Sequence, residues 1–207
     1  MVYYIFQSRG QSNVHGFFFA GQYCREEEKR DRISMNIVLI GYRCSGKTSV
    51  GQTLAEALNR DFMDTDELIE GKVGRSIEAI IARDGWDCFR DMEKEIIEEV
   101  SGRDHLVIAT GGGVVLDREN IRRLRGKGLL IWLKGSAAIL KERMERQQRE
   151  GTSRPSLTGK GPLEEIEQVL KIRTPLYEKA TDLTVNGDAL SVTDVAAAIL
   201  DRLPENI

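Results

Sequence analysis

The sequence contains few of the residues that build disulfide frameworks or metal centres. Its 207 residues include three cysteines and two histidines, and Cys24, Cys44 and Cys88 are far apart. An odd number of cysteines without CxxC spacing argues against a disulfide framework and against a structural zinc site. No apolar run approaches the roughly 18 residues that a membrane-spanning helix needs. We therefore expect a protein of the reducing cytoplasm that does not insert into a membrane.

An excess of positive charge is also missing. The formal net charge is −3, so the composition predicts no nucleic-acid partner. Charged residues make up 30% of the chain and hydrophobic residues 41%, which is ordinary for a globular protein. The length is enough for one domain with a full core, or for one domain with an appendage.

The first 34 residues differ from the rest and form a candidate appendage. Seven of the 13 aromatic residues fall there, without a clear helical period or sustained strand alternation. We expect residues 1–34 to be a disordered or loosely attached extension, or the result of a translation start assigned upstream of the true start at Met35. The alternative is a docking segment that uses the aromatic cluster at 17–19. A signal peptide is disfavoured because the start lacks a basic region and "GFFFAG" is too short.

From Met35 onward, short apolar runs alternate with segments of helical period. We expect strands near residues 36–41, 61–66, 105–113, 129–135 and 182–186. We expect helices near residues 46–59, 66–72, 76–100, 117–128, 136–148, 163–180 and 191–203. Pro175 is expected either to bend or to restart the helix in which it lies. This alternation predicts an α/β fold with a parallel sheet and helices on both faces, and ligands of such sheets bind beyond the carboxyl ends of the strands.

The stretch "GYRCSGKT" has the spacing G-x-x-x-x-G-K-[ST] and follows the first apolar run. Gly41 lets the chain curl at the end of the strand, and Gly46 lets backbone N–H groups approach phosphate oxygens at a helix N-terminus. Lys47 is placed to reach the β- and γ-phosphates, and the Thr48 hydroxyl can ligate Mg²⁺. The motif therefore predicts a protein that uses a nucleoside triphosphate, whether a kinase, a switch or a motor.

Two carboxylates follow the second predicted strand, in "DTD". Residues two apart on an extended chain face the same side, so Asp64 and Asp66 are both expected to point toward the ligand end of the sheet. Asp64 is a candidate for holding Mg²⁺ through water, because no acidic residue ends the strand at 105–113. Asp66 is a candidate base that accepts a hydrogen bond from a substrate hydroxyl. The alternative for Asp66 is a structural role as the N-cap of the helix at 66–72.

Glycines and arginines complete the candidate site. The glycines at 111–113 would let a ligand lie against bare backbone, and a flexible turn is the alternative. Arg90 lies three residues before Glu93 on a predicted helix, so the two can pair in a site or as a solvated surface pair. Arg154 lies in the loop "REGTSRPSLTGKGP", which could close over a nucleotide or remain solvated. Arg173 can bind a carboxylate or a phosphate, or pair with neighbouring glutamates.

The ordered set "GYRCSGKT", "DTD", "GRSI", "FRDME", "TGGG", "RPSL" and "IRTPLYEKA" resembles the signature of the shikimate kinase family. The resemblance covers residues 35 to about 203. It implies a P-loop kinase fold similar to that of nucleoside monophosphate kinases, with a five-stranded parallel sheet flanked by helices and a mobile lid. It also implies transfer of the γ-phosphoryl group of ATP to the 3-hydroxyl of shikimate, a step toward chorismate and the aromatic amino acids. Residues 35–207 are therefore expected to form a monomeric kinase domain whose partners are ATP and shikimate.

The resemblance implies a role for each site residue. Lys47, Asp66 and Arg154 would be catalytic, with Lys47 at the leaving phosphate, Asp66 as base and Arg154 as the arginine of the lid. One Mg²⁺ ion would be held by Thr48 and, through water, by Asp64. The residues implied to bind shikimate are Asp66, Phe89, Arg90, Glu93, Gly111, Gly112, Gly113 and Arg173. The residues implied to bind ATP are Gly41, Cys44, Ser45, Gly46, Lys47, Thr48, Ser49, Arg146, Arg149 and Arg154.

Some positions depart from the family pattern. Ser156 replaces the leucine that is more common after "RP", Ile81 stands where an aromatic often lines the substrate pocket, and Arg146 and Arg149 compete for the adenine. Two other functions are compatible with the P-loop: a gluconate-type or nucleotide kinase of the same fold, and a regulatory nucleotide-binding module. A nucleotide acceptor would not require "DTD", "FR" and "TGGG" together, and a regulatory module would be expected to lack a catalytic residue.

Overall fold

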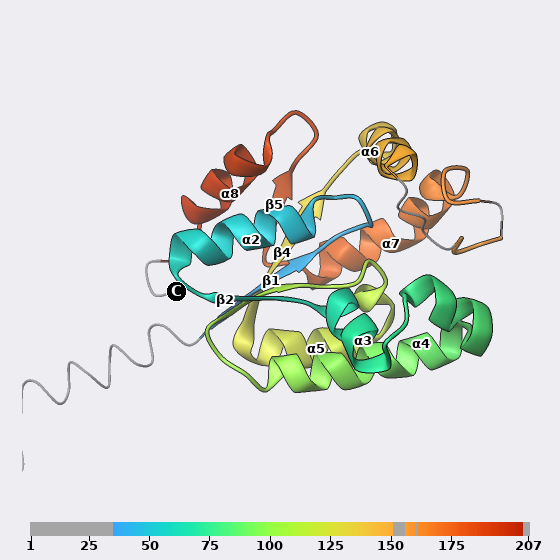
Figure 1. The fold of residues 1–207 in the computed structure, drawn as a ribbon. Helices are drawn as coiled ribbons and strands as arrows, with labels where there is room; N and C mark the ends of the chain where they lie inside the picture. The colour runs from blue at the N-terminus through green and yellow to red at the C-terminus, as the bar shows by residue number, and fades with distance from the viewer. Residues whose placement is uncertain (1–34, 151–155, 160, 205–207) are drawn as a thin grey trace, which may run out of the picture. The chain divides into compact units, whose positions relative to one another are not determined.

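The computed structural model describes residues 35–150, 156–159 and 161–204 (Figure 1). The predictions made for residues 1–34 and for Arg154 lie outside these residues and stay predictions. Among the helices within the described ranges, none is both long enough and apolar enough to cross a membrane.

The described residues contain one sheet of five parallel strands. The strands are β1 (Asn36–Ile40), β2 (Asp61–Asp64), β3 (Leu106–Ala109), β4 (Gly128–Lys134) and β5 (Leu183–Asn186). Their order across the sheet is β2-β3-β1-β4-β5, and every neighbouring pair is parallel. The predicted five-stranded parallel sheet is thus confirmed, whereas the mobile lid stays a prediction.

Helices follow the strands as the alternating pattern predicts. They are α2 (Lys47–Leu58), α3 (Thr65–Val73), α4 (Ile77–Ser101), α5 (Arg118–Lys127), α6 (Ala137–Arg149), α7 (Ile166–Ala180) and α8 (Val192–Leu200). A short 3-10 helix that the sequence did not predict, η1 (Val114–Leu116), lies between β3 and α5. Pro175 lies inside α7, which continues through it without a break.

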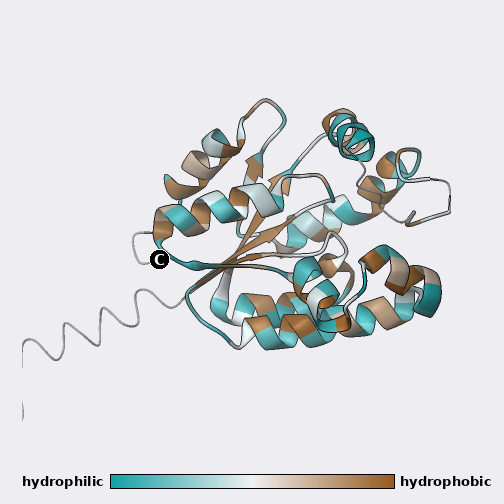
Figure 2. Cartoon of the chain, viewed as in Figure 1, coloured by the Kyte–Doolittle hydropathy of each residue, from teal (hydrophilic) through white to brown (hydrophobic). Residues whose placement is uncertain are grey.

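Alternate residues of the central strand pack against different helices. In β1, Ile37 and Leu39 join an apolar cluster with α2 and α8, whereas Val38 and Ile40 join one with α3, α4, α5 and α7. All five residues of β1 are buried, as expected of a strand covered on both faces. Figure 1 shows α2 and α8 on one side of the sheet and α4 and α5 on the other, and Figure 2 shows mostly hydrophobic strands between helices of mixed hydropathy.

Two of the predicted helices differ in detail from the structure. The helix predicted over 76–100 is interrupted at Gly85, whose φ of 84° and ψ of 172° belong to a backbone region that is almost exclusive to glycine. The helix predicted at 66–72 begins one residue earlier, and its N-cap is Asp64, whose side chain accepts a hydrogen bond from the Asp66 N–H. The alternative role of Asp66 as the N-cap is therefore wrong.

The loops that carry the motifs meet at one edge of the sheet. Asp64 of β2 pairs in register with Ala109 of β3, and Ala109 pairs with Leu39 of β1. The P-loop after β1, the start of α3 after β2 and the glycines after β3 therefore open at the same side. This register, which no local pattern shows, brings the three motifs within reach of one ligand.

Candidate active site

A cleft of about 560 Å³ opens at this edge of the sheet. Its walls come from the P-loop (residues 41–48), the start of α3, both parts of α4, the glycine loop (residues 111–113), α6, Leu157 and α7. The predicted site residues that line it are Cys44, Gly46, Lys47, Thr48, Ser49, Asp64, Asp66, Phe89, Arg90, Glu93, Gly111, Gly112, Gly113 and Arg173. Among the described residues, the predicted site residues that do not line it are Gly41, Ser45, Arg146 and Arg149.

The P-loop is closed around the side chain of Lys47. Gly46 has a φ of 94°, in the left-handed region, and α2 begins at the next residue. The Lys47 ammonium donates hydrogen bonds to the carbonyl oxygens of Gly41 (3.0 Å) and Tyr42 (2.9 Å). Lys47 is 9% exposed, so its charge lies in a largely water-excluded loop. The cradle of N–H groups and one cation is what the triphosphate of a nucleotide requires.

Thr48 and Asp64 lie together at the edge of the cleft. The Thr48 hydroxyl donates to Asp64 Oδ2 at 2.8 Å, and Asp64 Oδ1 accepts from the Asp66 N–H at 2.9 Å. Glu67 is another residue of the cleft. Partial burial raises its pKa, and the nearby Asp64 and Glu70 carboxylates raise the pKa further. This negative potential and these oxygen atoms fit Mg²⁺, which prefers oxygen ligands and retains several waters. The parts of the chain that the structure describes contain no group of three or more His, Cys, Asp or Glu side chains that could hold a metal.

Asp66 lies in the first turn of α3, so the argument from strand alternation does not apply to it. Its carboxylate nevertheless faces the cleft and lies close to Glu93 across Gly111. A Cβ atom at Gly111 would be 2.8 Å from Asp66 Oδ1 and 2.8 Å from Glu93 Oε1. The hydroxyl of the fully buried Thr65 accepts a hydrogen bond from the Gly111 N–H at 3.0 Å. A glycine is therefore required at position 111, because the two carboxylates occupy the space that a side chain would fill.

Arg90 is held in the cleft by a buried partner. Its guanidinium donates to Glu93 at 2.7 Å, and the Glu93 side chain is 2% exposed, so the interpretation as a solvated surface pair is wrong. The guanidinium carbon lies 5.1 Å from the ring centroid of Phe89 and 5.4 Å from that of Trp86. A Cβ at Gly113 would be 2.3–2.6 Å from this guanidinium group. The Glu93 carboxylate, two aromatic rings and the absence of a side chain at Gly113 thus define the place of the Arg90 guanidinium.

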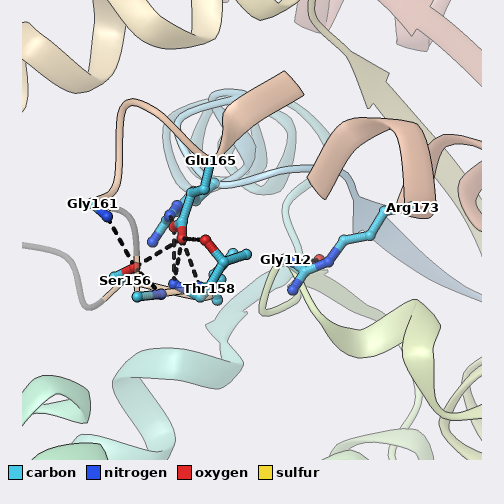
Figure 3. A network of polar contacts seen from close by, with 9 residues as sticks. Gly112, Ser156, Thr158, Gly161, Glu165 and Arg173 are labelled. Carbon is cyan, nitrogen blue, oxygen red and sulfur yellow. Dashed lines mark hydrogen bonds and ion pairs between the residues drawn. The ribbon is translucent and has the colours of Figure 1, made fainter. Parts of the chain in front are cut away.

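Arg173 and Tyr177 hold the glycine loop from α7. The Arg173 guanidinium donates to the Gly112 carbonyl at 2.9 Å (Figure 3), and the Tyr177 hydroxyl donates to the same oxygen at 2.6 Å. Burial raises the pKa of Tyr177, although the charge of Arg173 opposes this, so the phenol remains a donor. Tyr177 also stacks on Trp132, with ring centroids 5.6 Å apart. The described residues show a bond from Arg173 to the Gly112 carbonyl oxygen, and they show no hydrogen bond or ion pair of the predicted alternative kind, between Arg173 and neighbouring glutamates.

Several residues of this arrangement were not predicted from the sequence. They are Tyr42, Arg43, Thr65, Trp86, Glu165 and Tyr177. Tyr42, Arg43 and Thr65 lie inside the motifs "GYRCSGKT" and "DTD", and Tyr177 lies four residues after Arg173 and therefore on the same helical face. Arg146 and Arg149 were predicted at the adenine, and the structure places both on α6 outside the cleft lining, without testing that contact.

Comparison with known proteins identifies relatives of this arrangement. The family described as "Shikimate kinase" matches residues 43–204. The shikimate kinase of Symbiobacterium thermophilum is 42% identical over 171 residues, which cover 83% of this chain and 97% of that protein. The shikimate kinase of Syntrophus aciditrophicus is 40% identical over 185 residues, covering 86% and 93%. The structure of the shikimate kinase from Acinetobacter baumannii in complex with shikimate superposes with a TM-score of 0.76 at 33% identity, covering 86% of this chain and 99% of that one.

Proposed function

The chain belongs to the shikimate kinase family, and we propose that it transfers the γ-phosphoryl group of ATP to the 3-hydroxyl of shikimate with the residues that meet in this cleft. It is a P-loop phosphotransferase, and its product, shikimate 3-phosphate, leads to chorismate and the aromatic amino acids. The observation that carries the proposal is the meeting of Arg90, Arg173 and Asp66 around the glycine loop, in the same cleft as Lys47. A carboxylated polyol requires such a combination of guanidinium donors and carboxylate acceptors.

The acceptor is bound by groups that are already in place. Arg90 and Arg173 bind the shikimate carboxylate, each with its guanidinium fixed by a protein oxygen. Glu93 holds Arg90, and Phe89 forms an apolar wall beneath the guanidinium. Asp66 accepts a hydrogen bond from the substrate hydroxyl, orients its oxygen toward the γ-phosphate and takes the proton as the bond to phosphorus forms. Because these groups need little rearrangement, binding energy is available to position the attacking oxygen.

At the other end of the cleft, Lys47 stabilises the charge on the leaving phosphate. Its bonds to two P-loop carbonyls place the ammonium inside the cradle before a nucleotide arrives. Arg154, which lies outside the described residues, is proposed to add a second cation to the transferring group. Thr48 and Asp64 would hold one Mg²⁺ ion, the first directly and the second through water. When bound, Mg²⁺ supplies charge neutralisation on the β- and γ-phosphate oxygens.

Neither rival function explains the acceptor end as well. A nucleotide kinase has no need for two guanidinium groups fixed beside the glycine loop. Gluconate carries a carboxylate as shikimate does, and the family to which the chain belongs favours shikimate over it. A regulatory module would be free to lose Lys47, Asp66 or Arg90, yet all three line one cleft. We further propose that the kinase acts as a monomer in the cytoplasm. Light scattering at the protein concentration of the assay measures the oligomeric state.

Coupled measurement of ADP release with Mg-ATP tests the function directly. We expect release that depends on shikimate and not on gluconate or a nucleoside monophosphate, with the phosphate found on the 3-oxygen by ³¹P NMR. Asp66→Asn should lower kcat by about 10²–10⁴-fold, because a positioned base contributes that much. Binding of ATP without shikimate-dependent release would overturn the proposal in favour of a different acceptor or of the regulatory module.

A further inference from the structure

Glu165 is a fully buried carboxylate next to the nucleotide end of the cleft. It occupies the N-cap position of α7, but its side chain makes no capping hydrogen bond to that helix. The carboxylate points instead to a turn that contains Ser156 and Thr158 (Figure 3). Glutamate is rarely fully buried, because removing its charge from water is costly unless protein donors replace the water.

Donors from two separate segments surround this carboxylate. The N–H groups of Leu157 and Thr158 donate to Oε2 at 2.8 and 2.7 Å, and the hydroxyls of Ser156 and Thr158 donate to it at 2.9 and 3.0 Å. The Arg43 guanidinium, from the P-loop, forms an ion pair with Oε1. Burial raises the pKa of Glu165, but the hydrogen bonds outweigh it and leave the pKa below its usual range. Glu165 is therefore a charged group that joins the turn to the P-loop.

An apolar cluster adjoins the network and limits access of water. Its buried members are Tyr42, Leu140, Met144, Ile166 and Val169, and Leu157 packs against them. The Arg43 guanidinium lies 5.5 Å from the centroid of the Tyr42 ring, and its side chain is 10% exposed. In such surroundings the attraction between Arg43 and Glu165 is stronger than between exposed charges. The network is therefore a fixed connection and not a loose surface contact.

Arg43 and Leu157 both line the cleft, whereas Glu165 does not. We propose that Glu165 is a positioning residue for the nucleotide, which it influences by fixing Arg43 of the P-loop and the backbone at Leu157 as two walls of the site. This inference rests on the proposed function, because it places ATP at the P-loop end. It also gives a role to Ser156, whose hydroxyl donates to Glu165 and accepts from the N–H groups of Gly159 (2.8 Å) and Gly161 (3.3 Å).

The test compares Glu165→Gln with Glu164→Gln in the full chain. Glutamine keeps the size of Glu165 and one acceptor oxygen but removes the charge that pairs with Arg43. We expect the KM for ATP to rise about tenfold, as for loss of one charge-assisted hydrogen bond, while the KM for shikimate stays within about twofold. Glu164 is exposed, and its variant should keep both values. Assays are run below the melting temperature of each variant, so that a loss of folding does not enter the comparison.

A second pair of variants tests whether Glu165 acts through Arg43. The rise in the KM for ATP of Arg43→Met combined with Glu165→Gln should be smaller than the product of the two separate rises, because part of the effect of Glu165 passes through Arg43 and part through Leu157. Fully additive effects, an unchanged KM for ATP in Glu165→Gln, or equal rises in both KM values would each overturn the inference. If Glu165→Gln does not fold, Ser156→Ala removes one donor and should raise only the KM for ATP, by about two- to threefold.

Calorimetric binding of ADP separates this inference from the proposed function. An enzyme without shikimate-dependent turnover would disprove the function, yet weaker ADP binding by Glu165→Gln than by the wild type would still support the positioning role. Equal ADP binding by the two proteins would disprove that role.

Discussion

The two ends of the cleft are built in different ways. At the nucleotide end, residues 41–48 form one continuous segment of loop and helix start, and Lys47, the first residue of α2, closes it through bonds to the Gly41 and Tyr42 carbonyl oxygens. At the acceptor end, Asp66, Arg90 and Arg173 come from α3, α4 and α7, and they meet at glycines that follow β3. The first end depends on local backbone geometry, whereas the second depends on how distant elements pack. The difference teaches that a substitution at the acceptor end affects substrate binding through neighbouring side chains, whereas a substitution in the P-loop affects the phosphate contacts directly.

The largest effect is expected at the nucleotide end. Lys47→Ala removes the cation of the cradle and should lower kcat/KM for ATP by about 10³-fold, since preorganised charge is a major part of phosphoryl-transfer catalysis. Shikimate binding without nucleotide, measured by calorimetry, should change little, because the Lys47 ammonium donates to the carbonyl oxygens of Gly41 and Tyr42 at the nucleotide end of the cleft. An equal loss of shikimate affinity would show that the two ends are not independent.

A smaller effect is expected when a glycine of the acceptor end is filled. Gly113→Ala places a Cβ 2.3–2.6 Å from the guanidinium of Arg90, which Glu93 and two aromatic rings hold in place. Displacement of Arg90 should raise the KM for shikimate about tenfold and leave the KM for ATP nearly unchanged. Initial rates at saturating ATP measure the first value, and rates at saturating shikimate measure the second.

Gly126→Ala is the matched control for this substitution. Gly126 lies in α5, and an added Cβ would meet no described atom within 4 Å other than the neighbouring backbone of its own helix. The variant should keep both KM values and gain about 0.4–1 kcal/mol in the free energy of unfolding, because alanine restricts the unfolded chain. An unchanged shikimate KM in Gly113→Ala would mean that Arg90 moves without cost or does not bind the substrate.

The smallest effect is expected for removal of residues 1–34. The cleft residues that the structure describes all lie at or after Arg43, so a chain that starts at Met35 should keep kcat and both KM values within about twofold. Parallel kinetics of the two proteins provide the measurement. A selective rise in the KM for ATP would instead assign the extension to the nucleotide end, and loss of a binding partner with normal kinetics would favour the docking segment.

The course of the chain could be predicted because its signals are local. Buried parallel strands are short apolar runs, and helices such as α6 begin at a serine N-cap, Ser136. The break at Gly85 could not be predicted in the same way, because helical glycines occur and only packing decides which one interrupts a helix. The prediction that Asp66 faces the ligand end of the sheet is correct, but the argument from strand alternation is wrong, because Asp66 lies in a helix and not on an extended strand.

The sequence by itself determined the phosphate cradle and the alternation of strands and helices, because each is specified by residues within a few positions of one another. The resemblance to the shikimate kinase family added the roles in shikimate binding and in the lid, and it did so only for residues that match the motifs of the family. The tertiary structure alone decided which side chains fix those groups: Thr65 at Gly111, Tyr177 at Gly112, and Glu165 at Arg43. These contacts join residues 46, 65 and 122 positions apart. They depend on strand order and register, which the packing of the whole sheet determines and no short stretch encodes.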